Sequence, residues 1–377
     1  MKTSCLQENL AKGLSLVGRA VPVRSTLPQA SHVLMETDGG QLKLVATDLT
    51  IAITCWIGAT VEEEGAMTVP ARLLTDFVSS LPNEEIGLSV SGRNKLLQLK
   101  CARNEASMAG MDAQDFPPVP SIGDGLVLTL EPKSLRKAIT MTQFAAASDD
   151  TRPVLTGIHV LAEGDVLTLA AADGFRLAVY KLSLEQEVAE KVEIVIPARA
   201  LREVERLISE GDQPVEMAIN AARSQVRFKM DNTWELVATL IQAAFPNYSQ
   251  LIPQSYTTKA EVDMKQFLQE TRIAAIFARD GAGIVRVQVE PGEGGPGKMT
   301  ISARADEIGD HKGEMDVKVE GEASKIAFNS RYLQDVLQVL DVQTVLLETT
   351  SSSSPGVIRP LGDDRYVHVV MPMFVQW

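Results

Sequence analysis

The sequence predicts an α+β protein in which one domain, two helices packed on a mostly antiparallel sheet, occurs three times. Two sets of similar segments recur at intervals of about 130 residues. They are 69–72 (VPAR), 196–199 (IPAR) and 328–331 (FNSR), and 24–27 (RSTL), 152–155 (RPVL) and 281–284 (GAGI). A repeat of this length is a domain and exceeds the units of solenoids or propellers. We therefore expect the function to depend on three related domains acting together.

Each copy contains two segments whose apolar residues follow a helical period. The first predicted helices span residues 6–17, 132–146 and 264–278. The second helices follow the VPAR-like segments, and their apolar residues recur at i, i+3 or i+4 and i+7, as on a helix with one buried face. These residues are Leu73, Leu74, Phe77, Val78 and Leu81 in copy one, Leu201, Val204, Leu207 and Ile208 in copy two, and Leu333, Val336, Leu337 and Leu340 in copy three.

Strands are predicted between and after these helices. The first pair of each copy lies at 32–36 and 42–46, at 158–161 and 166–170, and at 284–289 and 298–303. The closing pair lies at 86–90 and 96–101, at 215–219 and 225–230, and at 345–348 and 366–370. A Pro/Gly-rich stretch at 117–125 and a turn-rich stretch at 246–258 place the domains at 1–125, 126–256 and 257–377. Residues 290–297 and 351–356 are predicted hairpin loops.

Composition excludes several classes of protein. Hydrophobic residues make up 45% of the chain, which suits a globular protein with buried cores. No apolar run reaches the ~18 residues of a membrane span, and the first residues lack a signal-peptide core, so we expect a cytoplasmic protein without a membrane partner. The net charge of −13 argues against nucleic-acid binding over the whole surface.

The cysteines and histidines predict neither a disulfide nor a metal site. Cys5, Cys55 and Cys101 have no CxxC spacing and suit reduced thiols. The four histidines are scattered and have no metal-ligand spacing. No cofactor is expected.

Positive charge gathers on the polar faces of the predicted helices. Arg199, Arg202 and Arg206 share one face, and similar sets occur in the other helices: Lys12 and Arg19; Lys133, Arg136 and Lys137; Lys265, Arg272 and Arg279. A salt-bridged, solvated helix face explains this pattern at least as well as a site, since Glu203, Glu205 and Glu270 lie among these residues. The alternative is a basic lining in an acidic body, which would attract phosphates without reading sequence.

No catalytic constellation is recognisable. Asp48 and Asp173 recur in similar positions (ATDL at 46–49 and AADG at 171–174), where an enzyme would have paired acids. Aspartates at the same point of two copies are better explained as turn residues at a strand end. The sequence also lacks nucleophile-elbow, dinucleotide and phosphate-loop motifs. An enzyme therefore remains the least favoured alternative.

Eight segments in order across the three copies resemble the bacterial sliding clamp, the beta subunit of DNA polymerase III. They are 24–28 (RSTLP), 46–49 (ATDL), 69–72 (VPAR), 115–117 (DFP), 152–157 (RPVLTG), 172–177 (ADGFRL), 245–248 (FPNY) and 369–373 (VVMPM). The resemblance spans nearly the whole chain. It implies three repeated DNA-clamp domains and a homodimer that closes head to tail into a ring, with helices inside and sheets outside.

The resemblance also gives the basic helix faces a role. They would line a hole around duplex DNA, held topologically and without sequence preference. Arg24 is expected at the DNA backbone by analogy. The other expected DNA-binding residues are Arg72, Lys137, Arg199, Arg202, Arg206 and Arg272.

The family binds short extended peptides of DNA polymerase and clamp-loader subunits in a pocket between the second and third domains. The matching positions are Leu155, Ala172, Gly174, Phe175, Arg176, Leu177, Pro246, Leu251, Val342, Thr344, Val369, Val370, Met371, Pro372 and Met373. Methionine and aliphatic side chains suit such a pocket, because flexible thioethers repack around different ligands. Residues 369–373 could instead form an ordinary buried C-terminal strand.

Several positions depart from the family. Phe175 stands where many clamps have histidine, Gln250 stands where some have arginine, and the chain ends in 374–377 (FVQW). The pocket would then prefer a different peptide or be partly covered by Trp377. The expected dimer interface joins Ala106 and Met108 to Ile276 and Phe277 of a second copy. The alternative function is a diverged, clamp-like peptide-binding scaffold that does not encircle DNA.

Overall fold

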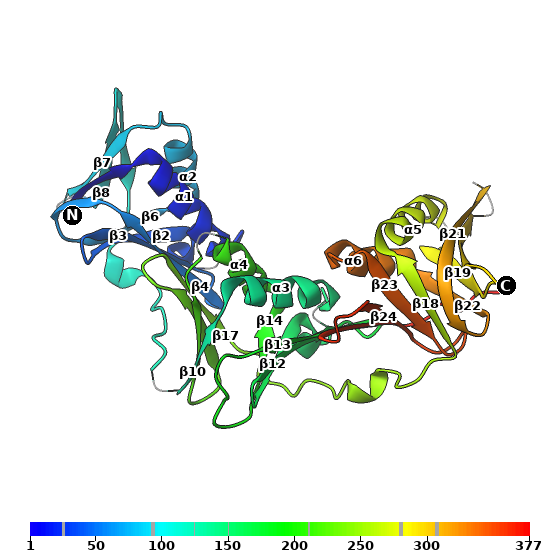
Figure 1. The fold of residues 1–377 in the computed structure, drawn as a ribbon. Coiled ribbons are helices and arrows are strands. Elements are labelled where there is room, and N and C mark those ends of the chain that lie inside the picture. Colours follow the sequence, from blue (N-terminus) through cyan, green and yellow to red (C-terminus); the bar gives the residue numbers. More distant parts are fainter. Residues whose placement is uncertain are drawn as a thin grey trace. The chain divides into compact units, whose positions relative to one another are not determined.

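The computed structural model describes residues 1–24, 27–91, 95–123, 125–149, 151–209, 212–278, 282–305 and 309–377. Ser25, Thr26, Arg279 and Gly281, which belong to segments considered above, lie outside the described residues. The chain forms two compact units (Figure 1). The first unit contains Met1–Arg136 and Arg199–Ile241, and the second contains Lys137–Ala198 and Gln242–Trp377. Each unit thus holds one whole copy of the repeat and part of the middle copy.

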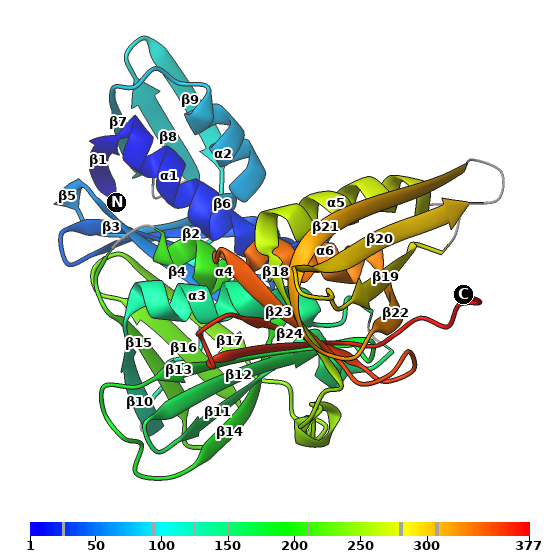
Figure 2. The same cartoon turned by 45° about the vertical axis from the view of Figure 1, so that its right-hand side comes forward.

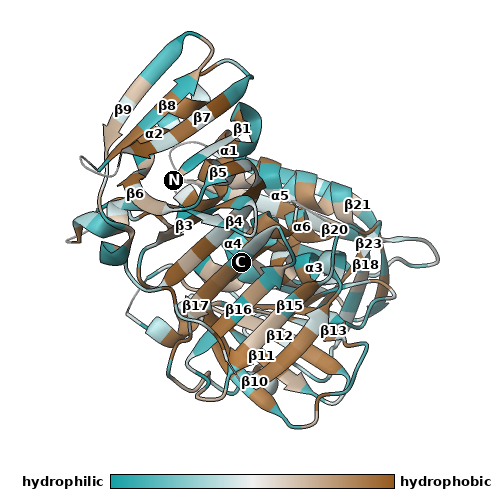
Figure 3. Cartoon of the chain, turned by 90° about the vertical axis from the view of Figure 1, so that its left-hand side faces the viewer, coloured by the Kyte–Doolittle hydropathy of each residue, from teal (hydrophilic) through white to brown (hydrophobic). Residues whose placement is uncertain are grey.

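The first unit contains two antiparallel sheets. The five-stranded sheet has the order β5 (Thr60–Glu63), β1 (Lys2–Leu6), β7 (Glu85–Ser91), β8 (Leu96–Cys101), β9 (Asn104–Ala109). The eight-stranded sheet has the order β10 (Gly125–Leu130), β15 (Val215–Asn220), β16 (Gln225–Met230), β17 (Trp234–Thr239), β4 (Ile51–Gly58), β3 (Gln41–Thr47), β2 (His32–Asp38), β6 (Ala66–Pro70). Burial alternates along β16, and Figure 3 shows hydrophilic and hydrophobic positions along the strands of this sheet.

The second unit contains one antiparallel sheet of twelve strands. Its order is β14 (Val192–Pro197), β11 (Gly157–Glu163), β12 (Val166–Ala172), β13 (Arg176–Ser183), β25 (Tyr366–Val370), β24 (Gly356–Pro360), β23 (Thr344–Thr349), β18 (Thr258–Asp263), β21 (Gly309–Gly321), β20 (Gly297–Ala305), β19 (Ile284–Glu290), β22 (Ser324–Asn329). The loops predicted at 290–297 and 351–356 join β19 to β20 and β23 to β24, which confirms both hairpins.

The helices bury one apolar face each. They are α1 (Gln7–Val17), α2 (Ala71–Ser79), α3 (Pro132–Thr142), α4 (Ala198–Ile208), α5 (Met264–Ala278) and α6 (Ser330–Val339). Helix α1 packs on β3 and β4, where a Cβ at Gly13 would lie 2.8 Å from Leu44 Cδ1. The side chain of Asn329 caps α6 by accepting a hydrogen bond from the Arg331 amide. Figure 2 shows α5 and α6 side by side in the second unit, where they pack together.

Each unit contains one seam at which strands of consecutive copies pair. In the first unit β4 of copy one pairs with β17 of copy two, with Ile53 opposite Leu236. In the second unit β13 of copy two pairs with β25 of copy three, with Ala178 opposite His368. In both seams, the strand after the first hairpin of one copy meets the last strand of the next copy.

The predicted helices and strands are present, with corrections to one helix, to one apolar face and to the set of strands. The helix predicted at 132–146 ends at Thr142 and continues as the 3-10 turn η4 (Gln143–Ala145). Leu73 was predicted on a buried face and is exposed, because Leu74 and Val78 occupy that face of α2. Thirteen strands among the described residues were not predicted, including the first strand of each copy (β1, β10 and β18), and β24 separates the strands predicted as a pair at 345–348 and 366–370.

All three cysteines are buried free thiols, as predicted. Burial raises the pKa of the Cys5 thiol to about 12, with a smaller effect of the Glu85 charge. None of the described helices is long and apolar enough to cross a membrane.

Candidate functional sites

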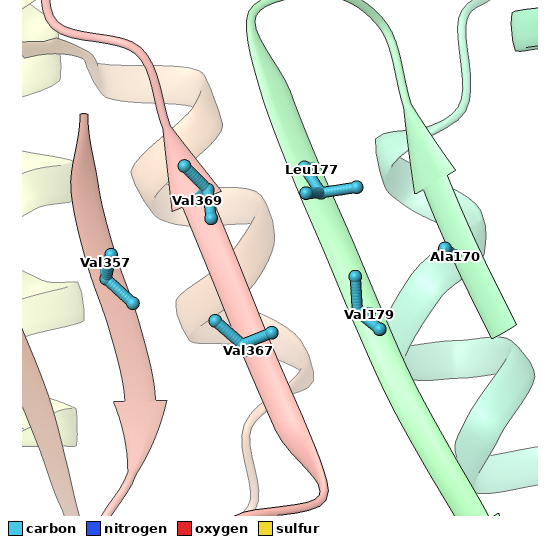
Figure 4. Packing of buried hydrophobic residues seen from close by; sticks show 6 residues of the cluster. All are labelled: Ala170, Leu177, Val179, Val357, Val367 and Val369. Carbon is cyan, nitrogen blue, oxygen red and sulfur yellow. The ribbon is translucent and has the colours of Figure 1, made fainter. Parts of the chain in front are cut away.

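The seam between β13 and β25 contains four of the predicted peptide residues, Arg176, Leu177, Val369 and Val370. Leu177 lies opposite Val369, and their side chains join Val179, Val357 and Val367 in one buried cluster (Figure 4). The partly buried residues Ala172, Tyr248 and Ile252 pack against this cluster. The seam is therefore the apolar floor of the candidate site. Residues 366–370 form a buried strand as predicted, whereas residues 371–373 lie outside any strand and Met371 is exposed, so the alternative of a buried strand over 369–373 is wrong beyond Val370.

The turn before β13 exposes Phe175 at the edge of this floor. Asp173 Oδ1 accepts hydrogen bonds from the amides of Phe175 (2.9 Å) and Arg176 (3.0 Å). Gly174 has φ +92°, in the region that favours glycine. The Phe175 side chain is 56% exposed, while its carbonyl accepts from the amide of Met371 at 2.8 Å. Asp173 is thus a strand-end turn residue, as predicted.

Arg176 is buried under this turn and does not face solvent. Its side chain is 7% exposed. Its nitrogens donate to Asp173 Oδ2 (3.0 Å), to Asp335 Oδ2 (2.6 Å) and to the Phe144 carbonyl (2.7 Å). The guanidinium also lies 4.5 Å from the centroid of the Tyr332 ring. Arg176 therefore joins the turn to η4 and α6 and holds the surface in place.

The other predicted peptide residues differ in exposure. Gly174, Pro246, Leu251 and Met371 are exposed, and Val342, Thr344, Pro372 and Met373 are half-buried; Leu155, Val369 and Val370 are buried. Segment 245–251 is anchored by Tyr248, whose hydroxyl lies 3.4 Å from His159 Nδ1. The ring of His159 stacks on Phe245, and its Nε2 lies 2.9 Å from Glu193 Oε1. Only a subset of the predicted residues can thus touch a ligand without rearrangement.

The C-terminal tail leaves the seam along β22. The Met373 amide donates to the Ala327 carbonyl at 2.7 Å, and Arg286 Nη2 donates to the Gln376 carbonyl at 3.4 Å. Phe374 is 86% exposed.

A basic cleft of about 890 Å³ lies in the first unit. Residues of α1, α2, α4 and the segment 18–24 line it. Three of the predicted DNA-binding residues, Arg24, Arg72 and Arg199, come together here, and Arg19 joins them. The cleft therefore collects positive charge from segments far apart in the sequence.

Two carboxylates, Asp48 and Asp76, also line the cleft. Arg199 Nη1 pairs with Asp48 Oδ2, while Asp48 Oδ1 accepts from the amides of Thr50 and Ile51 at 2.9 Å. Burial acts to raise the pKa of Asp48, but the Thr50 and Ile51 hydrogen bonds and the Arg199 charge outweigh it and hold the pKa below its usual value. Asp48 is thus also a turn residue at a strand end, as predicted.

The remaining predicted basic residues lie on helices and are exposed. Arg206 Nη1 bonds to Glu203 Oε1 at 2.8 Å, and Lys137 Nζ lies 3.9 Å from Asp363 Oδ2. Arg202 and Arg272 are exposed. No group of three or more metal-binding side chains occurs among the described residues.

Comparisons with known proteins match the chain along nearly its whole length. Family models of the DNA polymerase III beta subunit match residues 1–120 (N-terminal domain), 129–247 (central domain) and 249–374 (C-terminal domain). The chain belongs to the DNA polymerase III beta subunit family. The three matches repeat the order of the copies seen in the sequence, and the boundaries at 125/126 and 256/257 stay predictions.

Relatives and solved structures agree with this family. A beta sliding clamp of Synechococcus elongatus is 32% identical over 376 residues, 99% of each chain, and one of Staphylococcus aureus is 30% identical over 94% of each. The Bacillus subtilis DNA polymerase sliding clamp has a TM-score of 0.93 at 27% identity, with both chains fully covered. The Pseudomonas aeruginosa clamp bound to griselimycin has a TM-score of 0.92 at 30% identity, also with full coverage.

The residues predicted for a clamp-family dimer lie on an edge strand and on a helix, and they differ in exposure: Met108 is buried, Ala106 and Phe277 are half-buried and Ile276 is exposed. Ala106 and Met108 belong to β9, the outer strand of the five-stranded sheet. Ile276 is exposed on α5, and the ring of Phe277 stacks on His311 with centroids 5.8 Å apart.

Sequence reasoning missed three residues that shape the peptide surface: Phe144, Tyr332 and Asp335. Tyr332 and Asp335 lie three positions apart on the polar side of α6, and this spacing alone would have flagged a shared contact. Nothing local in the sequence points to Phe144, because Arg176 contacts its backbone carbonyl.

Proposed function

We propose that the chain is a DNA sliding clamp: two copies close into a ring around duplex DNA, and partner proteins dock by short peptides. Family membership supports this function. We also propose that the protein is not an enzyme and acts in the cytoplasm. Buried free thiols are usual in that compartment.

The main observation that supports a ring is that the same kind of strand pairing joins consecutive copies twice. Copies one and two join by β4 and β17, and copies two and three join by β13 and β25. The corresponding strand of copy three is the first half of β21, and the corresponding last strand of copy one is β9. Within the described residues, neither strand has a seam partner. If two chains joined head to tail, β21 of each chain would pair with β9 of the other. The closed ring would then leave neither strand without a partner.

The internal seams also predict the register of this contact. Thr54 lies opposite Glu235 in one seam, and Val179 lies opposite Val367 in the other. Aligning the strand pairs of the three copies places Lys312 opposite Glu105 of the second copy. Opposite charges facing each other across an antiparallel pair favour the contact.

The basic cleft supports DNA binding by charge. Arg24 and Arg72 are exposed there and form no ion pair within the described residues, so they can contact phosphates. The proposed contacts also include Lys137, Arg199, Arg202, Arg206 and Arg272. Contacts to phosphates carry no sequence information, which suits a ring that moves along DNA.

The peptide surface supports docking of extended partner segments. Phe175, Leu251 and Met371 expose apolar surface around the β13–β25 seam. Met371 can adapt to different ligands because its side chain is unbranched and flexible. We propose polymerase and clamp-loader peptides as the ligands. The griselimycin-bound relative shows that a clamp of this family accepts a ligand. Tethering raises the effective concentration of a partner at DNA without tight binding.

Retention on circular DNA tests the ring. The protein is loaded on nicked circular DNA with a clamp loader and separated from free protein by gel filtration. A ring stays with the circle and is lost when one cut linearises it. Retention on both forms would show ordinary binding, and retention on neither would favour the scaffold that does not encircle DNA.

A further inference from the structure

The basic cleft and the adjoining part of α4 carry their own counterions. The Asp48 side chain is 7% exposed and pairs with Arg199, which extends from the start of α4. The Glu203 side chain is 8% exposed and lies between two arginines, Arg206 at 2.8 Å and Arg19 at 3.8 Å. Two buried carboxylates thus face three of the arginines in this region.

These carboxylates are held in place by the fold. Asp48 Oδ1 is fixed by the amides of Thr50 and Ile51, so Oδ2 stays directed at Arg199. Glu203 lies on the buried side of α4, and its Oε2 has no hydrogen-bond partner among the described residues. An acceptor without a hydrogen bond in a buried place costs free energy. The positive charge of Arg19, 3.8 Å away, offsets part of this cost.

The arginines near the cleft therefore fall into two groups. Arg199, Arg206 and Arg19 are paired with carboxylates. Arg24, Arg72 and Arg202 are exposed and form no ion pair in the part of the chain that the structure describes. A paired arginine has little net charge to offer a phosphate, so it releases few counterions when DNA binds.

We propose that Asp48 and Glu203 attenuate the affinity of the cleft for DNA phosphates by neutralising Arg199, Arg206 and Arg19. This inference rests on the proposed DNA binding. Unpaired arginines supply the attraction, and the internal pairs keep it weak enough for movement along the duplex. The carboxylates are thus affinity-setting residues of the cleft.

The salt dependence of DNA binding tests this inference. Affinity for a short fluorescein-labelled duplex is measured by anisotropy over a range of salt concentrations. Each additional phosphate contact steepens the plot of log K against log salt by about 0.9, or about eightfold in affinity at 0.1 M relative to 1 M salt. Asp48→Asn should steepen the slope by about one contact and Glu203→Gln by up to about two. An asparagine at position 48 keeps an oxygen that can accept the hydrogen bonds of the Thr50 and Ile51 amides, so the turn is preserved.

Three controls make the result decisive. Glu62→Gln removes the same charge from an exposed pair with Lys2 outside the cleft and should leave the slope unchanged. In the wild type, Arg199→Ala should weaken binding much less than Arg24→Ala. In the Asp48→Asn background, Arg199→Ala should abolish the increase in affinity and in salt slope that Asp48→Asn produces. This comparison tests the inference even if Glu203→Gln misfolds.

The outcomes separate the inference from the function on which it rests. A wild type without salt-dependent DNA binding would contradict the proposed function itself. A wild type that binds DNA, with slopes unchanged or shallower in folded Asp48→Asn and Glu203→Gln proteins, would overturn the inference alone.

Discussion

Replacing Arg176 should loosen the second unit and leave the first unit intact. Arg176→Met keeps an apolar chain beside Tyr332 but removes three hydrogen bonds, at 3.0 Å to Asp173, 2.6 Å to Asp335 and 2.7 Å to the Phe144 carbonyl. Removing one partner of a buried ion pair costs about 3–5 kcal/mol. Asp335 is 26% exposed, and Asp173 keeps two amide hydrogen bonds, so the lower end applies. We expect a loss of about 3 kcal/mol.

Hydrogen exchange measures this loss locally, which matters because a chain with two units need not unfold in one step. Under conditions where exchange reports the opening equilibrium, 3 kcal/mol corresponds to roughly 100-fold faster exchange. The amides of β13 and β25 should show it, while those of β4 and β17 should not change. Arg176→Met should also lower the affinity for peptides, because the turn that bears Phe175 loses its hydrogen bonds to Arg176.

Arg365→Met is the matched control. Arg365 also bonds to a carboxylate, with Nε and Nη2 at 2.8 and 2.7 Å from the Asp363 oxygens, but its side chain is 55% exposed. Exposed pairs contribute about 0–1 kcal/mol, so exchange should change little. If Arg176→Met accelerates exchange less than about fivefold, or equally in both units, the reasoning about burial is wrong.

Three further predictions address the turn, the ring and acid stability. Gly174→Ala should cost about 1–3 kcal/mol, since φ is +92° and the new Cβ would lie 2.5 Å from Arg152 Nη1; thermal unfolding and peptide anisotropy measure it. Lys312→Glu or Glu105→Lys alone should weaken the dimer, and the double swap should restore it, in sedimentation velocity at increasing dilution. Burial, and secondarily the Arg176 charge, lowers the pKa of His368 to about 3. The unfolded state then binds the extra proton, so stability should fall as pH drops below about 6.5, by up to about 1.4 kcal/mol per unit.

Each of these predictions has an outcome that contradicts it. Unchanged melting and peptide affinity in Gly174→Ala would show that the turn tolerates a side chain. Lys318 pairs with Glu261 inside the chain, so Lys318→Glu should not rescue Glu105→Lys; if it does, the register is wrong. Leucine takes the place of His368 in the other seam, at Leu236. His368→Leu should therefore flatten the loss of stability between pH 7 and 5, and an equal loss in both proteins would exclude His368 as its cause.

Local patterns predicted the helices, the hairpins and both aspartate turns. These features depend on residues close together in the chain: apolar periods in α1 and α6, and a carboxylate that accepts amides two and three positions on. The first strands β1, β10 and β18 were not predicted, and each ends within two residues of the start of the following helix. A period of two cannot show which strands meet, so the seams also needed the structure.

In the candidate sites, too, the sequence predicted what depends on neighbouring residues and not what depends on residues far apart in the chain. The sequence identified which residues are basic and which are apolar, but their pairing partners lie far away in the chain. Arg176 and Asp335 are 159 positions apart, and Arg199 and Asp48 are 151 apart. Without the structure, the sequence could not show that Arg176 is held by Asp335 or that Arg199 is paired with Asp48. Ion pairs between residues far apart in the chain leave no local pattern. The sequence therefore shows which residues are charged but not which of those charges are neutralised by a partner.

Asp48 and Asp173 show how a repeated structural residue acquires different roles. In both turns, Oδ1 accepts two backbone amides, so folding uses one oxygen and leaves Oδ2 free. In copy two, Arg176 of the same turn takes Oδ2, and the pair supports the peptide surface. In copy one, Ile51 occupies the position of Arg176, and Oδ2 turns instead to Arg199 in the basic cleft. One turn can therefore serve two sites, because the residue that binds its second oxygen decides which surface it stabilises.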